Sequence, residues 1–351
     1  MKIVATKDIN PSDWRQLVQT SATGTWFQSP EAYDFFASQP ALFKPFAYGL
    51  INDQLPMTNY KSQLRAVCVG YVTKEKSKFK QYFTRRAIIV GGPVLADDAT
   101  DGEVAALMSA VRMELKSKAI YVECRNFNAY SRWKEAFVSA GFEYVPHLNF
   151  HVDTSSVEVV EANLGKSRKR DIKTTIREGV SIVPIDNVSC MTYDVSEGER
   201  MVHEYYLILK NLYETKVKTP LFPESFFQML AKHPDGRMLL TVLNGKVIGG
   251  TACVELANKC VYEWFACGED GVYPHVFPSC YATYVGIRYA AEHGCPRFDM
   301  MGAGKPDEAY GVRDFKAKFG GVEVEHGRYL AITKPLLYKL GVFGVKILKK
   351  R

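Results

Sequence analysis

The feature that most restricts the fold is an Asn-Gly pair between two apolar runs, residues 238–244 and 246–256. Asn244 and Gly245 both tolerate the positive φ angles of a two-residue turn, so the pair predicts a β-hairpin. A further strand is expected over residues 259–266, a helix over 279–293 and a strand over 297–300. This order of hairpin, strand, helix and strand predicts a mixed α+β domain in the second half.

The first half repeats that order without clear sequence identity. Strand patterns are expected over residues 46–52, 64–72, 83–90, 119–124 and 142–152, and a basic hairpin-like segment over 74–80. A helix over 101–117 has the clearest helical period, with apolar residues at Val104, Leu107, Met108, Val111 and Leu115. We therefore expect two α+β domains with mostly antiparallel sheets flanked by helices. The first spans residues 1–155 and is completed by the tail 323–351, and the second spans 156–322.

Composition is that of a soluble globular protein of about two domains. The 351 residues are 47% hydrophobic and 24% charged, with a formal net charge of +7. This moderate excess of base suits an anionic partner such as a nucleotide diphosphate, an RNA or an acidic membrane surface, and does not choose among them.

No secretory signal and no apolar run long enough to span a membrane is found. The eight cysteines lack a Cys-x-x-Cys pair, which favours buried thiols in a reducing cytoplasm and predicts no metal site. The segment 334–351 alternates apolar and basic residues. It predicts a helix packed on the domain, or one that lies on an anionic surface at the inner face of the membrane.

Glycine, aromatic and basic residues concentrate in the segment 298–321. A strand end leads into Gly302-Ala303-Gly304, where backbone can approach a ligand closely. Phe315 and Phe319 then fall on one helical face, among the cations Arg313, Lys316 and Lys318. The segment is either a site for a negatively charged substrate or a basic surface loop whose two Phe rings plug the core.

This strand, Gly-x-Gly loop and Phe-Lys-x-x-Phe-Gly sequence resembles the C-terminal signature of the Fem-type peptidyltransferases. These are aminoacyltransferases built from two tandem GNAT (acyl-CoA N-acyltransferase-like) domains. The basic segment 164–173 followed by Arg177-Glu178-Gly179-Val180 is similar to the family's basic helix, and residues 219–227 resemble its Pro-rich helix entry. The resemblance implies the tandem GNAT fold for this chain.

The resemblance also implies a reaction. An amino acid moves from aminoacyl-tRNA to the peptide amine of a peptidoglycan precursor, a lipid-linked or UDP-linked muropeptide. Because the ester is already activated, positioning and oxyanion stabilisation are the main tasks of the enzyme. Lys316 would stabilise the oxyanion and Phe315 would shape the pocket, while Arg313 and Lys318 are either phosphate contacts or plain surface charges.

Further candidates follow from the same resemblance. Tyr262 and Trp264 alternate on a strand and are either pocket or core residues, and Lys216 or Lys218 lies near the cation that meets the acceptor pyrophosphate. Glu123 and Arg125 end a strand at a candidate acceptor cleft. The candidate substrate-binding residues are Arg313, Lys318, Lys216, Lys218, Tyr262, Trp264, Glu123, Arg125, Gly302 and Gly304.

The donor is inferred from a missing motif. The sequence has no Arg/Gln-x-x-Gly-x-Gly/Ala loop, which in acetyl-CoA-dependent enzymes holds the pyrophosphate at a helix start. We therefore expect no cofactor and an aminoacyl-tRNA donor rather than acetyl-CoA. Two alternatives stay open: a GNAT-fold N-acyltransferase for an envelope polysaccharide or another amine precursor, and a non-catalytic basic RNA- or membrane-binding protein.

Overall fold

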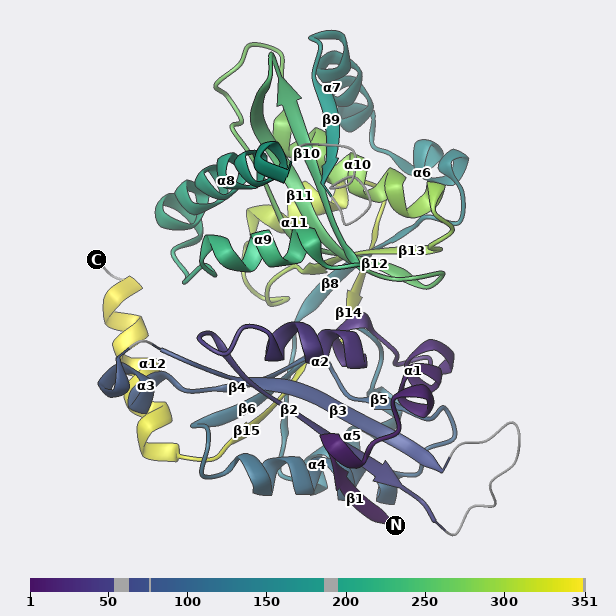
Figure 1. Ribbon diagram of the computed structural model, residues 1–351, viewed down its shortest axis with the longest axis vertical. Helices are drawn as coiled ribbons and strands as arrows, with labels where there is room; N and C mark the ends of the chain where they lie inside the picture. The colour runs from purple at the N-terminus through teal and green to yellow at the C-terminus, as the bar shows by residue number, and fades with distance from the viewer. Residues whose placement is uncertain (54–62, 76, 186–194, 350–351) are drawn as a thin grey trace. The chain divides into compact units, whose positions relative to one another are not determined.

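Two mixed β-sheets with helices packed against them organise the chain, as the computed structural model in Figure 1 shows. The structure describes residues 1–53, 63–75, 77–185 and 195–349. It divides into one unit of Met1–His147 with Glu325–Arg351 and a second unit of Leu148–Val324. The predicted α+β class is confirmed. Among the described residues, no helix is long and apolar enough to cross a membrane.

The first unit has a sheet in the order β1-β2-β3-β4-β6-β15-β7, with β5 paired to β3. Its strands are β1 (Lys2–Ala5), β2 (Phe43–Ile51), β3 (Leu64–Thr73), β4 (Ala87–Gly91), β5 (Val94–Leu95), β6 (Tyr121–Asn126), β7 (Glu143–Val145) and β15 (Arg328–Ile332). Its helices are α1 (Pro11–Thr20), α2 (Pro30–Ala37), α3 (Lys78–Thr84), α4 (Asp101–Leu115), α5 (Lys134–Ser139) and α12 (Pro335–Lys349).

The second unit has a sheet in the order β14-β8-β13-β12-β11-β10-β9. Its strands are β8 (Leu148–Asp153), β9 (Ser181–Ile185), β10 (Gly236–Leu243), β11 (Lys246–Leu256), β12 (Cys260–Gly268), β13 (Arg297–Gly302) and β14 (Val322–Glu325). Its helices are α6 (Val157–Asn163), α7 (Lys166–Arg177), α8 (Val195–Leu212), α9 (Glu224–Lys232), α10 (Pro278–Glu292) and α11 (Gly311–Ala317).

The two sheets have the same strand order, and each takes one strand from the other half of the sequence. β8 follows β7 in the chain but lies between β13 and β14, while β15 follows β14 but lies between β6 and β7. The expected closing strand over 142–152 is therefore two strands, of which only β7 stays in the first sheet. The chain divides after His147 rather than at residue 155, because His151 and Val152 pair with β13.

The hairpin predicted from Asn244-Gly245 is confirmed. Leu243 pairs with Lys246, so the loop contains two residues. Asn244 and Gly245 have φ angles of 51° and 77°, the left-handed values that a tight hairpin of this kind requires.

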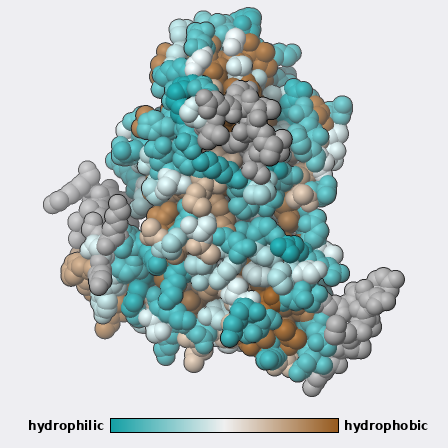
Figure 2. Space-filling model, in the orientation of Figure 1, coloured by the Kyte–Doolittle hydropathy of each residue, from teal (hydrophilic) through white to brown (hydrophobic). Residues whose placement is uncertain are grey.

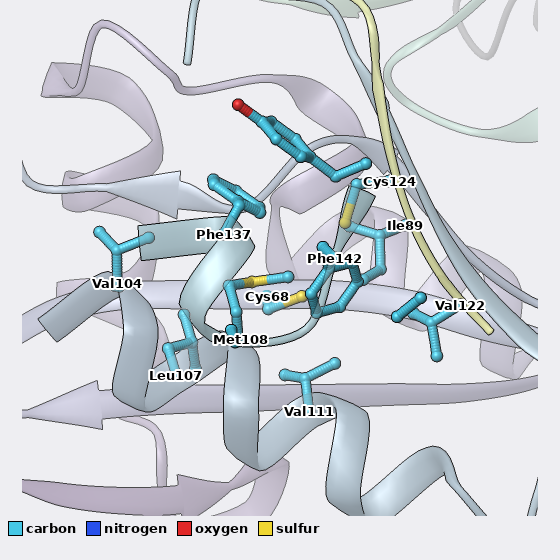
Figure 3. Packing of buried hydrophobic residues seen from close by; sticks show 14 of the residues in the cluster. Cys68, Ile89, Val104, Leu107, Met108, Val111, Val122, Cys124, Phe137 and Phe142 are labelled. Atoms are coloured by element: carbon cyan, nitrogen blue, oxygen red, sulfur yellow. The ribbon is translucent and has the colours of Figure 1, made fainter. Parts of the chain in front are cut away.

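The helix predicted from the 3.6-residue period is α4, and all five apolar residues named for it are buried. Thr100 caps the helix in a capping box with Glu103, which satisfies backbone N–H groups that have no partner within the helix. Figure 3 shows Val104, Met108 and Val111 packed with Cys68 and Cys124 of the neighbouring strands.

The segment 74–80 is not a hairpin. Its described part leads into helix α3, where the Phe79 and Phe83 rings lie one turn apart with centroids 5.2 Å from each other. The Gln81 side chain accepts a hydrogen bond from the Glu75 N–H and donates one to the Thr73 carbonyl. The backbone at Thr73 and Glu75 is therefore hydrogen-bonded to the side chain of a helical residue, where we expected the second strand of a hairpin. Residue 76 lies outside the described residues.

The exchanged strand β15 should be essential to the stability of the first unit. Tyr329 on β15 is 1% exposed and stacks on Phe137 with ring centroids 4.0 Å apart. We expect Tyr329→Ala to lower the free energy of unfolding by about 3–5 kcal/mol, the usual cost of an aromatic deletion in a core. Urea unfolding followed by tryptophan fluorescence measures this, since three of the four tryptophans lie in the first unit.

Ile332→Ala is the matched control, because Ile332 lies on the same strand and is 40% exposed. Its effect should stay within about 0.5 kcal/mol. Equal effects of the two substitutions would show that β15 does not anchor the first unit through Tyr329.

Candidate functional site

The candidate site lies in the second unit, where β12 and β13 diverge. The two strands run parallel and pair at Val261–Phe298 and Tyr262–Asp299. Along the rest of their described length they make no further pair, although β12 continues to Gly268 and β13 to Gly302. Backbone groups at the end of β13 therefore need partners other than β12.

The Lys316 ammonium supplies such partners. Lys316 lies near the end of α11 and is only 8% exposed. Its Nζ donates to the carbonyl of Met300 and, at 2.9 Å, to the carbonyl of Gly302. The cation of the predicted signature is thus fixed inside the second unit and is not a surface charge.

Two buried carboxylates lie near this ammonium, Glu263 on β12 and Asp299 on β13. Burial lowers the pKa of Lys316, and the attraction of both carboxylates opposes that change. Burial likewise raises the pKa of Glu263, against the attraction of Lys316. The Glu263 Oε1 also accepts a hydrogen bond from Thr251 at 3.3 Å. A buried charge is tolerated when it has such partners.

Asp299 also fixes the backbone that receives the ammonium. Its Oδ1 accepts a hydrogen bond from the Met301 N–H at 2.7 Å, and its Oδ2 lies 3.2 Å from His151 Nε2 on β8. Met301 has a φ angle of 58°, which is rare for a residue with a side chain. Backbone strain of this kind costs about 1–3 kcal/mol and persists where neighbouring contacts impose it.

Arg313 holds the loop that follows β13. Its guanidinium donates to the carbonyls of Ala303 and Pro306, both at 3.2 Å, and to that of Lys305. In the same loop Gly304 has a φ angle of 80°. These bonds engage Arg313 with backbone, whereas the sequence left open a phosphate contact or a plain surface charge.

The basic helix α7 packs on α11 through Arg168. Its guanidinium lies 4.4 Å from the Phe315 ring centroid and 4.9 Å from that of Phe319, within the range of a cation–π interaction. The Gly165 N–H donates to the Lys318 carbonyl at 3.0 Å, while the Lys318 side chain is exposed. Two segments singled out in the sequence therefore form one assembly.

The aromatic candidates on β12 lie in different environments. Tyr262 is fully buried and paired with Asp299. A β-bulge opposite Ala252 and Cys253 interrupts the alternation of side chains between the two faces of β12. The Trp264 ring packs edge-on against that of Phe226, with centroids 5.1 Å apart. Tyr262 thus lies beside the buried polar groups, and Trp264 contributes to an aromatic cluster on α9.

Lys216 and Lys218 are both exposed, on and just after the π-helical turn Tyr213–Val217 that extends α8. In this turn burial raises the pKa of Tyr213 to about 12, with a smaller contribution from Tyr310. Because Tyr310 precedes α11, the turn and the glycine loop are neighbours.

Glu123 and Arg125 belong to a polar cluster of the first unit. Glu123 lies 2.9 Å from Arg125 Nε and 2.7 Å from Arg328 NH1. Arg328 in turn lies 2.8 Å from His147 Nε2. The pKa of Glu123 is lowered to about 2, because the attraction of the two guanidinium groups outweighs burial.

Of the sequence candidates, the structure brings together around the end of β13 the residues Gly302, Gly304, Arg313, Phe315, Lys316 and Tyr262. The sequence analysis missed the residues that support them, Arg168, Glu263 and Asp299, and it also missed Arg328, which pairs with Glu123 in the first unit. A charged residue inside an otherwise apolar strand, as at 263 and 299, was the available signal. Within the described ranges, no group of three or more His, Cys, Asp or Glu side chains could hold a metal ion.

The Glu123 cluster should make stability depend on acid pH. Since the folded pKa of about 2 lies below the ordinary 4.5, the contribution is complete above pH 4.5 and is lost as the pH falls toward 2. It amounts to about 3 kcal/mol at most. We expect Glu123→Gln to destabilise the chain at neutral pH and to flatten the decline of stability between pH 5 and 2, measured by urea unfolding at a series of pH values.

The control is Glu143→Gln on β7, since Glu143 is exposed. It should keep the pH profile of the unsubstituted chain. If Glu123→Gln kept that profile too, the ion pairs with Arg125 and Arg328 would not stabilise the fold.

Comparison with solved structures identifies the fold. The crystal structure of FemX is similar with a TM-score of 0.69 and 12% identity, over 97% of this chain and 99% of that one. A tandem GNAT protein from the clavulanic acid biosynthesis pathway is similar with a TM-score of 0.54 and 12% identity, over 95% of this chain and 98% of that one. L-PGS from Bacillus licheniformis is similar with a TM-score of 0.53 and 10% identity, over 93% of this chain and 92% of that one. At these identities the likeness shows the fold, which is that of tandem GNAT-like proteins.

Sequence comparison adds a family match to part of the chain. The model of the FemAB family matches residues 244–344, the part that contains β12, β13 and Lys316. Among curated proteins none matches the chain. The family match indicates a transferase that acts on an amine. The resemblance of this chain to the Fem-type family with tandem GNAT-like domains is thereby confirmed.

Proposed function

We propose that this chain is a peptidoglycan aminoacyltransferase, which moves an amino acid from aminoacyl-tRNA to the peptide amine of a lipid-linked or UDP-linked muropeptide. The observation that carries the proposal is the Lys316 ammonium, buried at the end of β13 within the part that matches the FemAB family. The reaction takes place in the cytoplasm, where aminoacyl-tRNA is available.

The geometry of Lys316 suits oxyanion stabilisation. An ammonium has three N–H donors, and the carbonyls of Met300 and Gly302 take two of them. The remaining N–H would donate to the carbonyl oxygen of the ester as the amine attacks. A fixed donor in a buried site stabilises developing charge far better than water does.

The bonds in this step balance. The acceptor amine forms a C–N bond to the ester carbon, the C–O bond to the tRNA ribose breaks, and the amine proton passes to the departing ribose oxygen. Lys316 keeps its protons throughout, which fits an ammonium compensated by Glu263 and Asp299. Phe315 lies one residue away and is partly exposed beside Arg168, where it can shape the approach to the cation.

Two helix starts support an aminoacyl-tRNA donor over acetyl-CoA. In GNAT enzymes the pyrophosphate of CoA binds amides at a helix N-terminus. At α10 the Ser279 N–H donates to Asp270 at 3.1 Å, and at α4 the Thr100 N–H donates to Glu103 at 2.9 Å. A pyrophosphate at either position would meet a carboxylate, and like charges repel.

Lys316→Met tests the catalytic assignment. Loss of one oxyanion donor lowers kcat by about 100-fold or more, and KM should change little, because substrate contacts elsewhere remain. Transfer from charged tRNA to a UDP-linked muropeptide measures both. Lys318→Met is the matched control, since Lys318 is the exposed lysine two residues on, and its kcat should be unchanged.

Lys316→Arg guards against loss of folding, because it keeps the positive charge beside Glu263 and Asp299. It should fold and still lose turnover, since a guanidinium cannot take the place of the ammonium. Turnover that survives Lys316→Met would refute the assignment. Thermal stabilisation by acetyl-CoA alone, and by neither muropeptide nor aminoacyl-tRNA, would favour a GNAT-fold N-acyltransferase instead.

A further inference from the structure

An exposed aromatic cluster lies on α3 in the first unit. The side chain of Phe79 is 75% exposed, and those of Tyr82 and Phe83 are also exposed. The three rings contact one another, with centroids 5.2 Å apart for Phe79–Phe83 and 5.1 Å for Tyr82–Phe83. Single exposed apolar residues are ordinary, but contiguous ones mark a surface that binds something.

Helix α12 extends this apolar surface. Leu336 is 79% exposed, and Leu340 and Phe343 are exposed too. Their spacing of four and three residues places them on one helical face. The opposite side of the helix faces the first unit, where the Tyr338 ring packs edge-on against Tyr121 at 5.4 Å. The apolar face of this amphipathic helix therefore points outward.

The two helices pack against each other in the first unit, as Figure 1 shows for α3 and the yellow α12. In the same orientation, Figure 2 shows hydrophobic residues on the surface at that edge. The exposed side chains of α3 and α12 therefore form one surface, which we call the apolar patch: Phe79, Tyr82, Phe83, Leu336, Leu340 and Phe343.

A basic pocket lies beside the apolar patch. It has a volume of about 540 Å³, and its lining includes the cations Lys44, Lys74, Arg85 and Lys118 and one carboxylate, that of Glu75. The Arg85 guanidinium lies 5.6 Å from the Tyr82 ring centroid, so it joins pocket and patch. Burial lowers the pKa of Lys334, the residue before α12, and repulsion from the nearby Arg85 guanidinium adds to that change.

We propose that the apolar patch and the basic pocket form a docking surface for an anionic lipid bilayer. The aromatic and aliphatic side chains enter the boundary between headgroups and acyl chains, and the cations of the pocket bind lipid phosphate groups. Charge complementarity selects this occupant, since apolar side chains rimmed by Lys and Arg are the pattern of helices that lie in a membrane interface. An RNA would use the cations and leave Leu336, Leu340 and Phe343 without a role.

Vesicle sedimentation with the full chain tests the proposal. Vesicles of phosphatidylglycerol and phosphatidylcholine should bind the chain at least about tenfold more tightly than phosphatidylcholine alone, because each basic residue near an anionic surface contributes about fivefold. Added salt should weaken that binding. Lys44→Gln combined with Lys118→Gln should reduce it by about 25-fold.

The double variant Leu336→Ser, Leu340→Ser tests the apolar component and should weaken binding by about tenfold or more. Val138→Ser on α5 is the matched control, since Val138 is likewise an exposed apolar residue of the first unit. It should bind like the unsubstituted chain, and thermal unfolding checks that all variants fold.

Three results would overturn the proposal: equal binding to both kinds of vesicle, a Leu336/Leu340 variant that binds like Val138→Ser, or lysine variants that lose only tRNA binding. The inference stands apart from the proposed function, because vesicle binding needs no substrate. Docking variants should keep full turnover with a water-soluble UDP-linked acceptor, while Lys316→Met should bind vesicles normally.

Discussion

The second unit depends on hydrogen bonds between the Lys316 ammonium and the end of strand β13, which is not paired with β12 there. Where β12 diverges from β13, Lys316 satisfies two carbonyls of β13, and Glu263 and Asp299 compensate its charge. A buried ammonium is costly unless it has hydrogen bonds and opposite charges. Its position is therefore tightly determined, and the same fixed cation is what an acyl-transfer site needs.

Strand exchange between the halves supports both polar clusters. Asp299, the third residue of β13, contacts the side chain of His151 from β8. In the corresponding place Glu123, the third residue of β6, forms an ion pair with Arg328 from β15. Both β8 and β15 come from the other half of the sequence. Each half of the sequence thus supplies a basic side chain to a carboxylate of the other half's sheet, a fully buried one at Asp299 and a partly buried one at Glu123.

Local patterns predicted a large part of the fold and of the site. The Asn244-Gly245 turn, helix α4 and the concentration of basic and aromatic residues before Gly320 all depend on neighbours within a few residues, so the sequence reveals them. The supporting groups did not emerge this way. Arg168 reaches Phe315 across 147 positions, and Glu263 acquires its role only through Lys316.

The sequence by itself determined the elements, the duplicated order and which lysine lies in the family's signature, because periodicity, turn chemistry and a short motif are local. Only the tertiary structure decided that β8 and β15 change sheets, that Lys316 is buried while Lys318 is exposed, and that Arg313 binds backbone. Burial and hydrogen-bond partners result from packing between segments far apart in the chain. No local pattern of residues contains that information.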